Sequence, residues 1–503
     1  MEIRVKTGAI EQHPADAIII NLFDDKRIGG ATQAVDQALN GAVSALVEGG
    51  DFGGKPGEVA VIYPRGAIPA RRVIVVGLGK RAEFSVETVR RAAGAAAIKA
   101  RDLGAKVVGT IVQGAGAAGL APDVAAQAVV EGSLLALYQW RGLKSGADDL
   151  KPEPDALELV ARPGADATPV EAGARAGQVI AEATALARDL VNNPPNVATP
   201  TMLAETARQI AARFGMRVQV LGRADMEALG MGSFLGVARG TEEPPTFTIL
   251  EHNPDSATTI VLVGKGITFD TGGISLKPGE NMETMKSDMA GAAAVLGAVQ
   301  AAGALNLPLH VVGLVPATDN MPSGRAYKPA DVLKAMNGKT IEVITTDAEG
   351  RLILADALCY AARFQPAAVV DLATLTGACV VALGAGMAAG LFCDDEKLRA
   401  RLLAAAEATH ERLWHLPLFP EYLDAIKSDT ADIKNAAGRM AGVGTSAMFL
   451  KQFAEGYPWA HLDIAGMAGV MMGGDKPSPA PYQPKGASGF GVRLLVEMLR
   501  RWS

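Results

Sequence analysis

The chain has 503 residues, of which 49% are hydrophobic and 20% are charged, as in an ordinary globular protein. Its net charge of −6 at pH 7 gives no sign of a nucleic-acid-binding protein, and no apolar run reaches the roughly 18 residues of a membrane span. The three cysteines, Cys359, Cys379 and Cys393, are too few for a disulfide framework, so we expect a cytoplasmic protein. The N-terminus lacks an apolar core of signal-peptide length.

Residues 1–165 alternate between short β-branched runs and helical stretches. Strands are expected at 17–23, 59–63, 73–77 and 107–112, and helices at 30–48, 85–103 and 121–139. This alternation predicts a mainly parallel sheet covered by helices on both faces. The turn Gly77-Leu78-Gly79-Lys80 follows a strand and is one way to hold an anion, but such glycine-rich turns are usually only turns.

A stretch rich in Gly, Pro, Asp and Lys, residues 144–168, indicates a boundary. An alanine-rich helix is expected next, at 170–191, and ends before Pro194-Pro195 because proline cannot continue it. Thr199 is the expected N-cap of the following helix, with Pro200 at its first position. We therefore expect an N-terminal α/β domain at 1–165, a connecting helix at 166–195 and a C-terminal domain at 196–503.

Charged side chains gather in the second half of the chain where predicted strands end. Asp347, Glu349 and Arg351 alternate after a β-branched run at 340–344, so in an extended backbone they would point the same way. Another strand, expected at 259–263, leads into a glycine-rich loop with further charges. Ligands of open α/β sheets bind at such strand ends, so we expect one site. Its charged members are Lys265, Asp270, Lys277, Asp288, Asp347, Glu349 and Arg351.

Four carboxylates in one site repel each other unless cations neutralise them. Two lysines and an arginine would do this in a salt-bridged cluster, whereas two divalent ions bridged by shared carboxylates would do it in a hydrolytic site. Oxygen ligands suit Mg, Mn or a catalytic Zn. The six histidines are scattered, and no H-E-x-x-H, Walker A or G-x-S-x-G motif occurs. The residues alone do not decide between a salt-bridged structural cluster and a metal site.

The segment 346–352, Thr-Asp-Ala-Glu-Gly-Arg-Leu, resembles the N-T-D-A-E-G-R-L signature of the leucyl (cytosol) aminopeptidases, with Thr345 in place of the asparagine. Further segments of the chain resemble the same family, at 263–273, 285–289, 320–324 and 461–466. The resemblance covers residues 190–503, and the first 165 match only in size and general pattern. It implies an α/β protein of two domains, with a smaller N-terminal domain and a larger catalytic domain whose mixed central sheet is covered by helices.

The resemblance also implies two divalent metal ions per subunit, Mn²⁺ or Zn²⁺. One would be bound by Asp270, Asp347 and Glu349, and the other by Lys265, Asp270, Asp288 and Glu349. The two metals would hold a bridging hydroxide that attacks the peptide carbonyl. A lysine that binds metal must be an uncharged amine, so metal binding has to remove its proton.

Two catalytic residues are implied by the same resemblance. Lys277 would stabilise the oxyanion, and Arg351 would hold bicarbonate as the general base. The first side chain of the substrate would lie against Met285, Thr374, Gly377 and Ala465. His461 and Asp463, in contrast, are expected to support the fold and not to bind metal.

The implied activity is removal of N-terminal leucine and other, mainly apolar, residues from peptides with a free N-terminus. The implied protein is a cytoplasmic homohexamer with no membrane or nucleic-acid partner. Two alternatives stay open. One is a nucleotide- or nucleic-acid-binding protein with a vestigial peptidase scaffold, although no basic, aromatic-interleaved stretch supports it. The other is a metal-dependent phosphatase, which also uses carboxylates around two metals.

Overall fold

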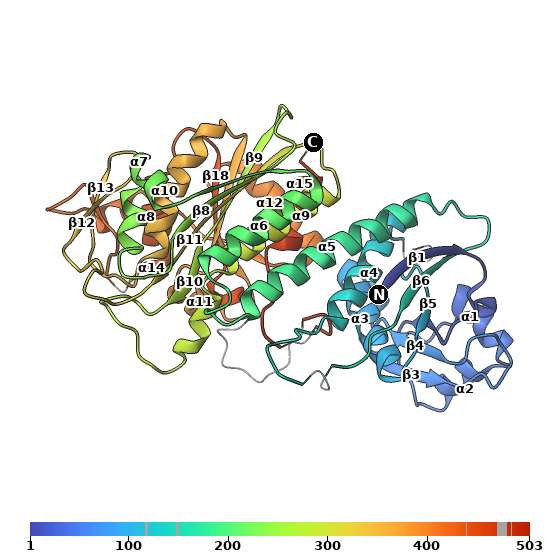
Figure 1. The fold of residues 1–503 in the computed structure, drawn as a ribbon. Coiled ribbons are helices and arrows are strands. Elements are labelled where there is room, and N and C mark those ends of the chain that lie inside the picture. Colours follow the sequence, from blue (N-terminus) through green and yellow to red (C-terminus); the bar gives the residue numbers. More distant parts are fainter. Residues whose placement is uncertain (116–118, 147–149, 439, 470–479, 484, 503) are drawn as a thin grey trace. The chain divides into compact units, whose positions relative to one another are not determined.

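The computed structural model describes the chain except residues 116–118, 147–149, 439, 470–479, 484 and 503 (Figure 1). It forms two compact units. Unit 1 consists of Met1–Glu182 with Lys476–Pro484, and unit 2 consists of Ala183–Asp475 with Lys485–Ser503. The division falls inside helix α5 (Thr168–Asn192), which was expected at 170–191. The predicted domain boundaries stay a prediction, because compactness does not establish which segments fold independently.

Unit 1 contains a six-stranded sheet in the order β1-β6-β5-β2-β4-β3, in which only the β3–β4 pair is antiparallel. The strands are β1 (Glu2–Thr7), β2 (Ala17–Leu22), β3 (Val59–Ile62), β4 (Val73–Gly77), β5 (Val107–Ile111) and β6 (Ala156–Ala161). The helices are α1 (Gly30–Ala38), α2 (Ala42–Glu48), α3 (Val86–Asp102) and α4 (Pro122–Leu137). The mainly parallel sheet expected from the sequence is confirmed, but the edge strand β1 and its neighbour β6 were not predicted.

Both faces of this sheet are buried. Along β2, Ile19 packs into the core that contains α3 and α4, whereas Ile18 and Ile20 pack into the core that contains α1 and α2. This alternation follows from the two-residue period of a strand. The single helix expected at 30–48 is wrong. It is broken between α1 and α2, where Asn40 and Gly41 have φ angles of 52° and 82°.

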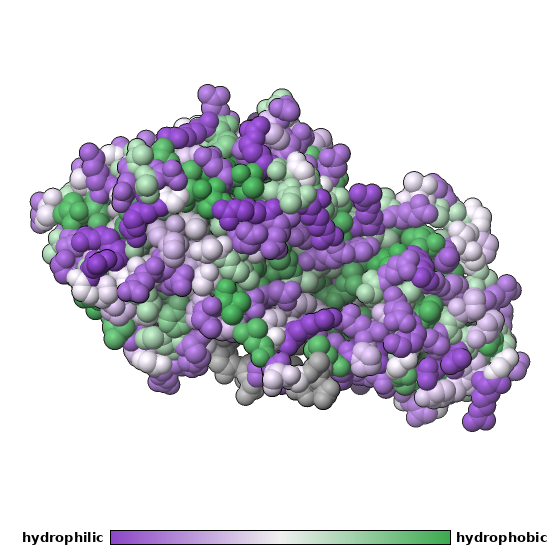
Figure 2. Space-filling model, viewed as in Figure 1, coloured by the Kyte–Doolittle hydropathy of each residue, from purple (hydrophilic) through white to green (hydrophobic). Residues whose placement is uncertain are grey.

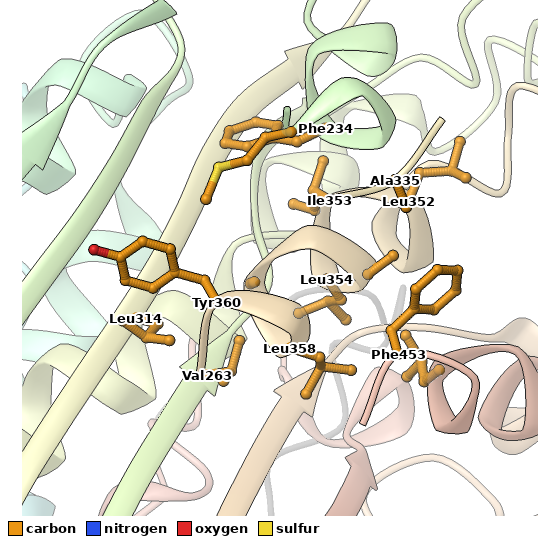
Figure 3. Packing of buried hydrophobic residues seen from close by; sticks show 14 of the residues in the cluster. Phe234, Val263, Leu314, Ala335, Leu352, Ile353, Leu354, Leu358, Tyr360 and Phe453 are labelled. Atoms are coloured by element: carbon orange, nitrogen blue, oxygen red, sulfur yellow. The ribbon is translucent and has the colours of Figure 1, made fainter. Parts of the chain in front are cut away.

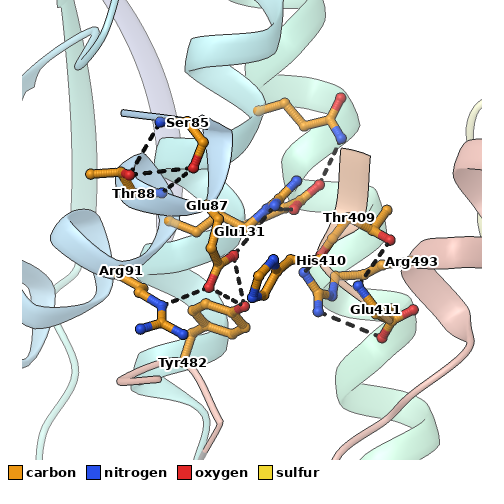
Figure 4. Close-up of polar contacts among 12 residues, drawn as sticks. Ser85, Glu87, Thr88, Arg91, Glu131, Thr409, His410, Glu411, Tyr482 and Arg493 are labelled. Carbon is orange, nitrogen blue, oxygen red and sulfur yellow. Dashed lines mark hydrogen bonds and ion pairs between the residues drawn. The ribbon is translucent and has the colours of Figure 1, made fainter. Parts of the chain in front are cut away.

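Polar contacts fix the ends of elements within unit 1 (Figure 4). Ser85 is the N-cap of α3, and its hydroxyl accepts a hydrogen bond from the Thr88 amide. The Tyr482 hydroxyl donates to the Glu87 carboxylate at 2.8 Å, which ties the late segment 480–483 to α3. Arg90 and Glu131 form a buried ion pair of 2.7 Å between α3 and α4.

Unit 2 is built on a nine-stranded mixed sheet in the order β16-β15-β18-β14-β9-β11-β8-β7, with β10 paired to β11. Strands β18, β14, β9 and β11 are mutually parallel, and antiparallel pairs flank them on both sides. The strands are β7 (Arg217–Leu221), β8 (Thr246–His252), β9 (Thr259–Gly264), β10 (Gly266–Asp270), β11 (His310–Asn320), β14 (Ala368–Ala373), β15 (Ala389–Phe392), β16 (Leu413–His415) and β18 (Trp459–Asp463). A small separate sheet contains β12 (Val332–Lys334), β13 (Thr340–Glu342) and β17 (Ile433–Lys434).

Helices of unit 2 pack against the nine-stranded sheet or against one another, and their buried side chains contribute to the core. They are α6 (Pro200–Phe214), α7 (Arg223–Ala228), α8 (Gly232–Val237), α9 (Ala290–Ala304), α10 (Gly350–Ala361), α11 (Gly377–Leu383), α12 (Glu396–Thr409), α13 (Glu421–Ala425), α14 (Gly442–Lys451) and α15 (Val492–Arg500). The 3-10 helices of unit 2 are η3 (Met282–Ser287), η4 (Ala362–Phe364) and η5 (Ala465–Met467), whereas η1 (Ile10–Gln12) and η2 (Arg81–Glu83) belong to unit 1. Thr199 caps α6 as predicted, since its hydroxyl accepts from the Met202 amide.

Helix α10 is central to the core of unit 2. Its Leu352, Ile353, Leu354 and Leu358 are fully buried, and Figure 3 shows them among side chains such as Phe453. Burial of one such side chain contributes roughly 1.5–3 kcal/mol, so the first turn of α10 is firmly fixed. The face drawn in Figure 2 mixes polar and apolar residues. Among the described residues, no helix combines the length and the apolar composition that a membrane span requires.

Candidate metal centre

The candidate site lies where three neighbouring parallel strands of unit 2 end. Lys265 follows β9, Thr374 follows β14 and Ala465 comes two residues after β18. Asp270 is the last residue of β10, which continues β9 along the same side of β11. The carboxyl ends of these strands and the loops after them therefore form one concave edge, as expected for an open α/β sheet.

Lys265 lies at the bottom of the site. Its Nζ is 2.8 Å from Asp288 Oδ2 and 2.9 Å from Glu349 Oε1, and it donates to the main-chain oxygen of Thr374 at 2.9 Å. All of these groups are buried. Gly350 leaves the necessary room, because a Cβ there would lie 2.4 Å from the Lys265 side chain. The Lys265 amine is therefore buried and closely surrounded by oxygen atoms, and only glycine fits at position 350 beside it.

Lys277 makes the second link between acidic side chains. Its Nζ lies 2.9 Å from Asp270 Oδ2 and also pairs with Asp347. The other oxygen of Asp270 accepts hydrogen bonds from Asn320 Nδ2 at 2.8 Å and from the Gly272 amide at 2.9 Å. Asn320, the last residue of β11, was not among the predicted site residues, although its segment carried the resemblance.

The acidic side chains converge as metal ligands do. Asp270, Asp347 and Glu349 each bring one carboxylate oxygen within 4.8 Å of the others. The two lysine amines lie among the carboxylates, where a cation is needed to offset their repulsion. This donor set, dominated by oxygen with one amine, fits divalent ions such as Mn²⁺ or a catalytic Zn²⁺.

The pKa values follow from burial and from the neighbouring charges. Burial, together with the nearby Glu349, raises the pKa of Asp270 to about 6. Burial also raises the pKa of Asp288 well above its usual range. Burial opposes the charge of Lys265, but Asp288 and Glu349 outweigh it and raise the pKa of this amine. Lys265 is therefore charged without metal, and a metal ion that bound to this amine would have to displace its proton.

Arg351 lies in the first turn of α10 and is buried. One terminal nitrogen donates to the main-chain oxygen of Asn435 at 2.8 Å, whereas Nε has no partner among the described residues. Burial lowers the pKa of this guanidinium to about 10. Buried donors are nearly always satisfied, so an unpartnered Nε on a residue that lines a cavity is a donor available to an acceptor such as a small anion.

All seven predicted charged residues line one cavity of about 280 Å³. The predicted substrate residues Met285, Thr374, Gly377 and Ala465 line it as well. The extended backbone expected for 347–351 is wrong. Residues 346–347 form a turn, Glu349 has helical dihedral angles and Arg351 lies in α10. The three side chains reach the cavity from a turn and a helix start, not from one face of a strand.

Sequence reasoning missed one wall of the cavity. It comes from the loop after β17 and from the start of α14, and it consists of Ala436, Ala437, Gly438, Gly442, Thr445 and Ser446. The loop after β14 adds Leu375, Thr376 and Ala378, which were also not predicted. These are small or weakly polar residues without a charge pattern, and the run of small residues after Asn435 was the only available signal.

Comparison with known proteins decides the family. A model of the catalytic domain of the cytosol aminopeptidase family matches residues 185–496, and a model of the N-terminal domain of that family matches residues 19–147. The chain belongs to the cytosol aminopeptidase family. The resemblance and the two-domain α/β fold expected from it are confirmed. As a member of this family, the chain is an aminopeptidase, a metal-dependent hydrolase that acts at peptide N-termini.

Relatives of the chain match along its whole length. It is 46% identical over 515 residues to a protein of Roseiflexus castenholzii described as "Probable cytosol aminopeptidase", with 100% of both chains covered. A protein of Geobacter sulfurreducens with the same description is 45% identical, with 99% of each covered.

Two solved structures are similar in fold. A variant of tomato leucine aminopeptidase has a TM-score of 0.87 and 34% identity, covering 100% of this chain and 96% of that one. The bottromycin maturation enzyme BotP in complex with Mn has a TM-score of 0.85 and 36% identity, covering 97% of this chain and 99% of that one.

Proposed function

We propose that this aminopeptidase uses two divalent metal ions to remove N-terminal leucine and other, mainly apolar, residues from peptides. Asp270, Asp347 and Glu349 would bind one ion, and Lys265, Asp270, Asp288 and Glu349 the other. The observation that carries the proposal is the convergence of three carboxylate oxygens within 4.8 Å beside a buried lysine amine. A purely structural cluster would not require this much buried charge, because burying ions costs free energy that their pairing often fails to offset.

When bound, the ions would polarise the scissile carbonyl and activate water as the nucleophile. The chain itself stabilises the charge that develops. The Lys277 ammonium lies at the cavity, and burial is outweighed by Asp270, Glu349 and Asp347, so its pKa is raised and it stays protonated at neutral pH. A fixed cation of this kind can donate to the developing oxyanion.

The attacking water must lose a proton to a base. No histidine is found among the described residues that line the cavity, so another group has to accept this proton. Arg351 has a planar guanidinium and a free Nε, which suits a carboxylate-like anion. We propose that this anion is bicarbonate and that it accepts the proton of the attacking water. The backbone oxygen of Asn435 would then orient the guanidinium.

The side chain of the first substrate residue would lie against Met285, Thr374, Gly377 and Ala465. Methionine adapts its shape to different apolar partners, which suits a preference that is broad and mainly apolar. Mn²⁺ or Zn²⁺ is the proposed metal, since both accept these ligands. A cytoplasmic homohexamer is the proposed assembly, and its support is membership of the family.

Hydrolysis of leucine p-nitroanilide and of p-nitrophenyl phosphate, each with and without Mn²⁺, tests this function. The aminopeptidase proposal predicts metal-dependent hydrolysis of the anilide and none of the phosphate ester. Phosphate-ester hydrolysis alone would instead support the phosphatase alternative. Retention on heparin with steep salt dependence, in a protein that cleaves neither compound, would support the nucleic-acid-binding alternative.

A further inference from the structure

Asp463, the last residue of β18, joins two walls of the cavity without lining it. Its side chain is fully buried. Oδ2 accepts a hydrogen bond from the Thr376 hydroxyl at 2.7 Å. Oδ1 accepts from the amides of Ala465, Leu375 and Thr376 at 3.2, 3.3 and 3.4 Å, respectively. One carboxylate therefore receives four donors from two separate segments.

The donors are the residues that shape the cavity. Leu375 and Thr376 belong to the loop after β14, Ala465 belongs to η5 after β18, and all three line the cavity. Thr376 is also the N-cap of α11, because its hydroxyl accepts from the Cys379 amide at 3.0 Å. The position of Gly377, the first residue of α11, thus depends on the same hydroxyl that donates to Asp463.

The loop after β14 has little other means of keeping its shape. Residues 374–376 belong to no strand or helix. Thr374 is fixed separately, since its hydroxyl donates to Asp288 at 2.6 Å and its main-chain oxygen accepts from Lys265. Hydrogen bonds to a buried carboxylate are stronger than neutral ones, so Asp463 is the main constraint on the residues that follow Thr374.

We propose that Asp463 is a positioning residue that determines the shape of the pocket for the first substrate side chain, and hence the preference for one N-terminal residue over another. It acts by fixing the spacing between Leu375–Gly377 and Ala465, and it does not touch the substrate. The inference rests on the proposed function, because it deepens the assignment of that pocket.

A second buried carboxylate provides a matched control. Asp371 lies on the adjacent strand β14, paired in register with His461, and is equally buried. Its oxygens lie 2.5 Å from His461 Nδ1 and accept from Trp459 Nε1 at 2.7 Å. None of these three residues lines the cavity. Loss of the Asp371 charge therefore perturbs the same sheet without loosening the pocket loops.

The experiment compares Asp463→Asn with Asp371→Asn on leucine and alanine p-nitroanilides. In Asp463→Asn the ratio of kcat/KM for leucyl over alanyl substrate should fall by about tenfold, in the range that a mis-shaped apolar pocket costs. Most of the fall should come from a higher KM for the leucyl substrate, with bound metal unchanged. Asp371→Asn should lower the melting temperature and leave the ratio as in the wild type.

Thr376 provides a second pair of variants if Asp463→Asn fails to fold. Thr376→Ser keeps the hydroxyl that donates to Asp463 and caps α11, whereas Thr376→Val keeps the shape and loses both bonds. The inference predicts that the serine variant retains the wild-type ratio and the valine variant loses it. The opposite order would overturn the inference, as would an unchanged ratio in a folded Asp463→Asn variant. A wild-type protein that cleaves neither anilide would instead refute the proposed function.

Discussion

The Lys265 amine lies 2.9 Å from Glu349 Oε1 although both side chains are almost completely buried. This pair belongs to a cluster of four carboxylates and two amines, and with Arg351 the formal charge of the cavity lining is −4 + 3 = −1. A net negative charge at a concave, partly buried edge attracts cations. Two divalent ions would replace the proton on Lys265 and leave Lys277 charged, which gives the two lysines opposite roles.

Glu349→Ala should abolish turnover while the protein stays folded. Removal of a residue that only hydrogen-bonds to a metal ligand typically lowers activity by roughly 10–100-fold. Turnover should fall by more than this in Glu349→Ala, because Glu349 would bind both ions. Metal content and turnover are measured together. Glu396→Ala is the control, since Glu396 is exposed on α12. A Glu349→Ala variant that keeps two bound ions and normal turnover would refute the bridging role.

Lys265→Ala and Lys277→Ala should fail in different ways. Lys265→Ala should lose one ion and recover partly when metal is added, because it removes a ligand. Lys277→Ala should keep both ions and lose about 10²–10³-fold in kcat, the usual cost of one oxyanion donor. Lys277→Arg should recover only part of this loss, because its fork does not reproduce a compact ammonium. Equal metal loss in both alanine variants would contradict these roles.

Arg351→Lys should weaken the response to bicarbonate. The variant keeps a positive charge but lacks the planar fork that holds an anion through two nitrogens. In carbonate-depleted buffer, added bicarbonate should increase turnover of the wild type and have little effect on the variant, with KM nearly unchanged. Equal stimulation of both proteins would show that Arg351 does not hold this anion.

The His461–Asp371 pair should make stability depend on pH. Burial alone would lower the pKa of His461, but Asp371 outweighs it, so the folded pKa is above the ordinary value of 6.5. The pair therefore stabilises the fold fully below pH 6.5, and this contribution decreases as the pH rises through the folded pKa. The difference in melting temperature between wild type and Asp371→Asn should shrink from pH 6 toward alkaline pH. A difference that grows with pH would contradict this assignment.

Much of the site follows from sequence because chemistry-bearing residues stand directly after buried strands. Lys265 and Thr374 follow β9 and β14, and parallel strands bring their ends together. The local conformation of residues 347–351, in contrast, was not predicted correctly from the sequence. Alternation of charged residues predicts a strand face, but the buried apolar residues from Leu352 onward begin a helix that includes Arg351.

Other features had no adequate signal in the sequence. The wall that Ala436, Ala437, Gly438, Gly442, Thr445 and Ser446 form consists of small residues, whose role comes only from the space that they leave. Strand β1, in contrast, did carry a signal that was overlooked, because charged residues alternate with Ile3 and Val5 along Glu2–Thr7 at the edge of the sheet. Asp463 was expected to support the fold, but its hydrogen-bond donors could not be predicted, because four donors from two distant segments meet only in the folded chain.

Metal titration of the chelated protein tests the central claim most directly. Metal is removed exhaustively, its absence is confirmed by elemental analysis, and leucine p-nitroanilide hydrolysis is followed as Mn²⁺ or Zn²⁺ is added. The two-metal account predicts no turnover in the metal-free protein and full activity when two ions per chain are bound. Full turnover by protein whose metal content is confirmed near zero would contradict it.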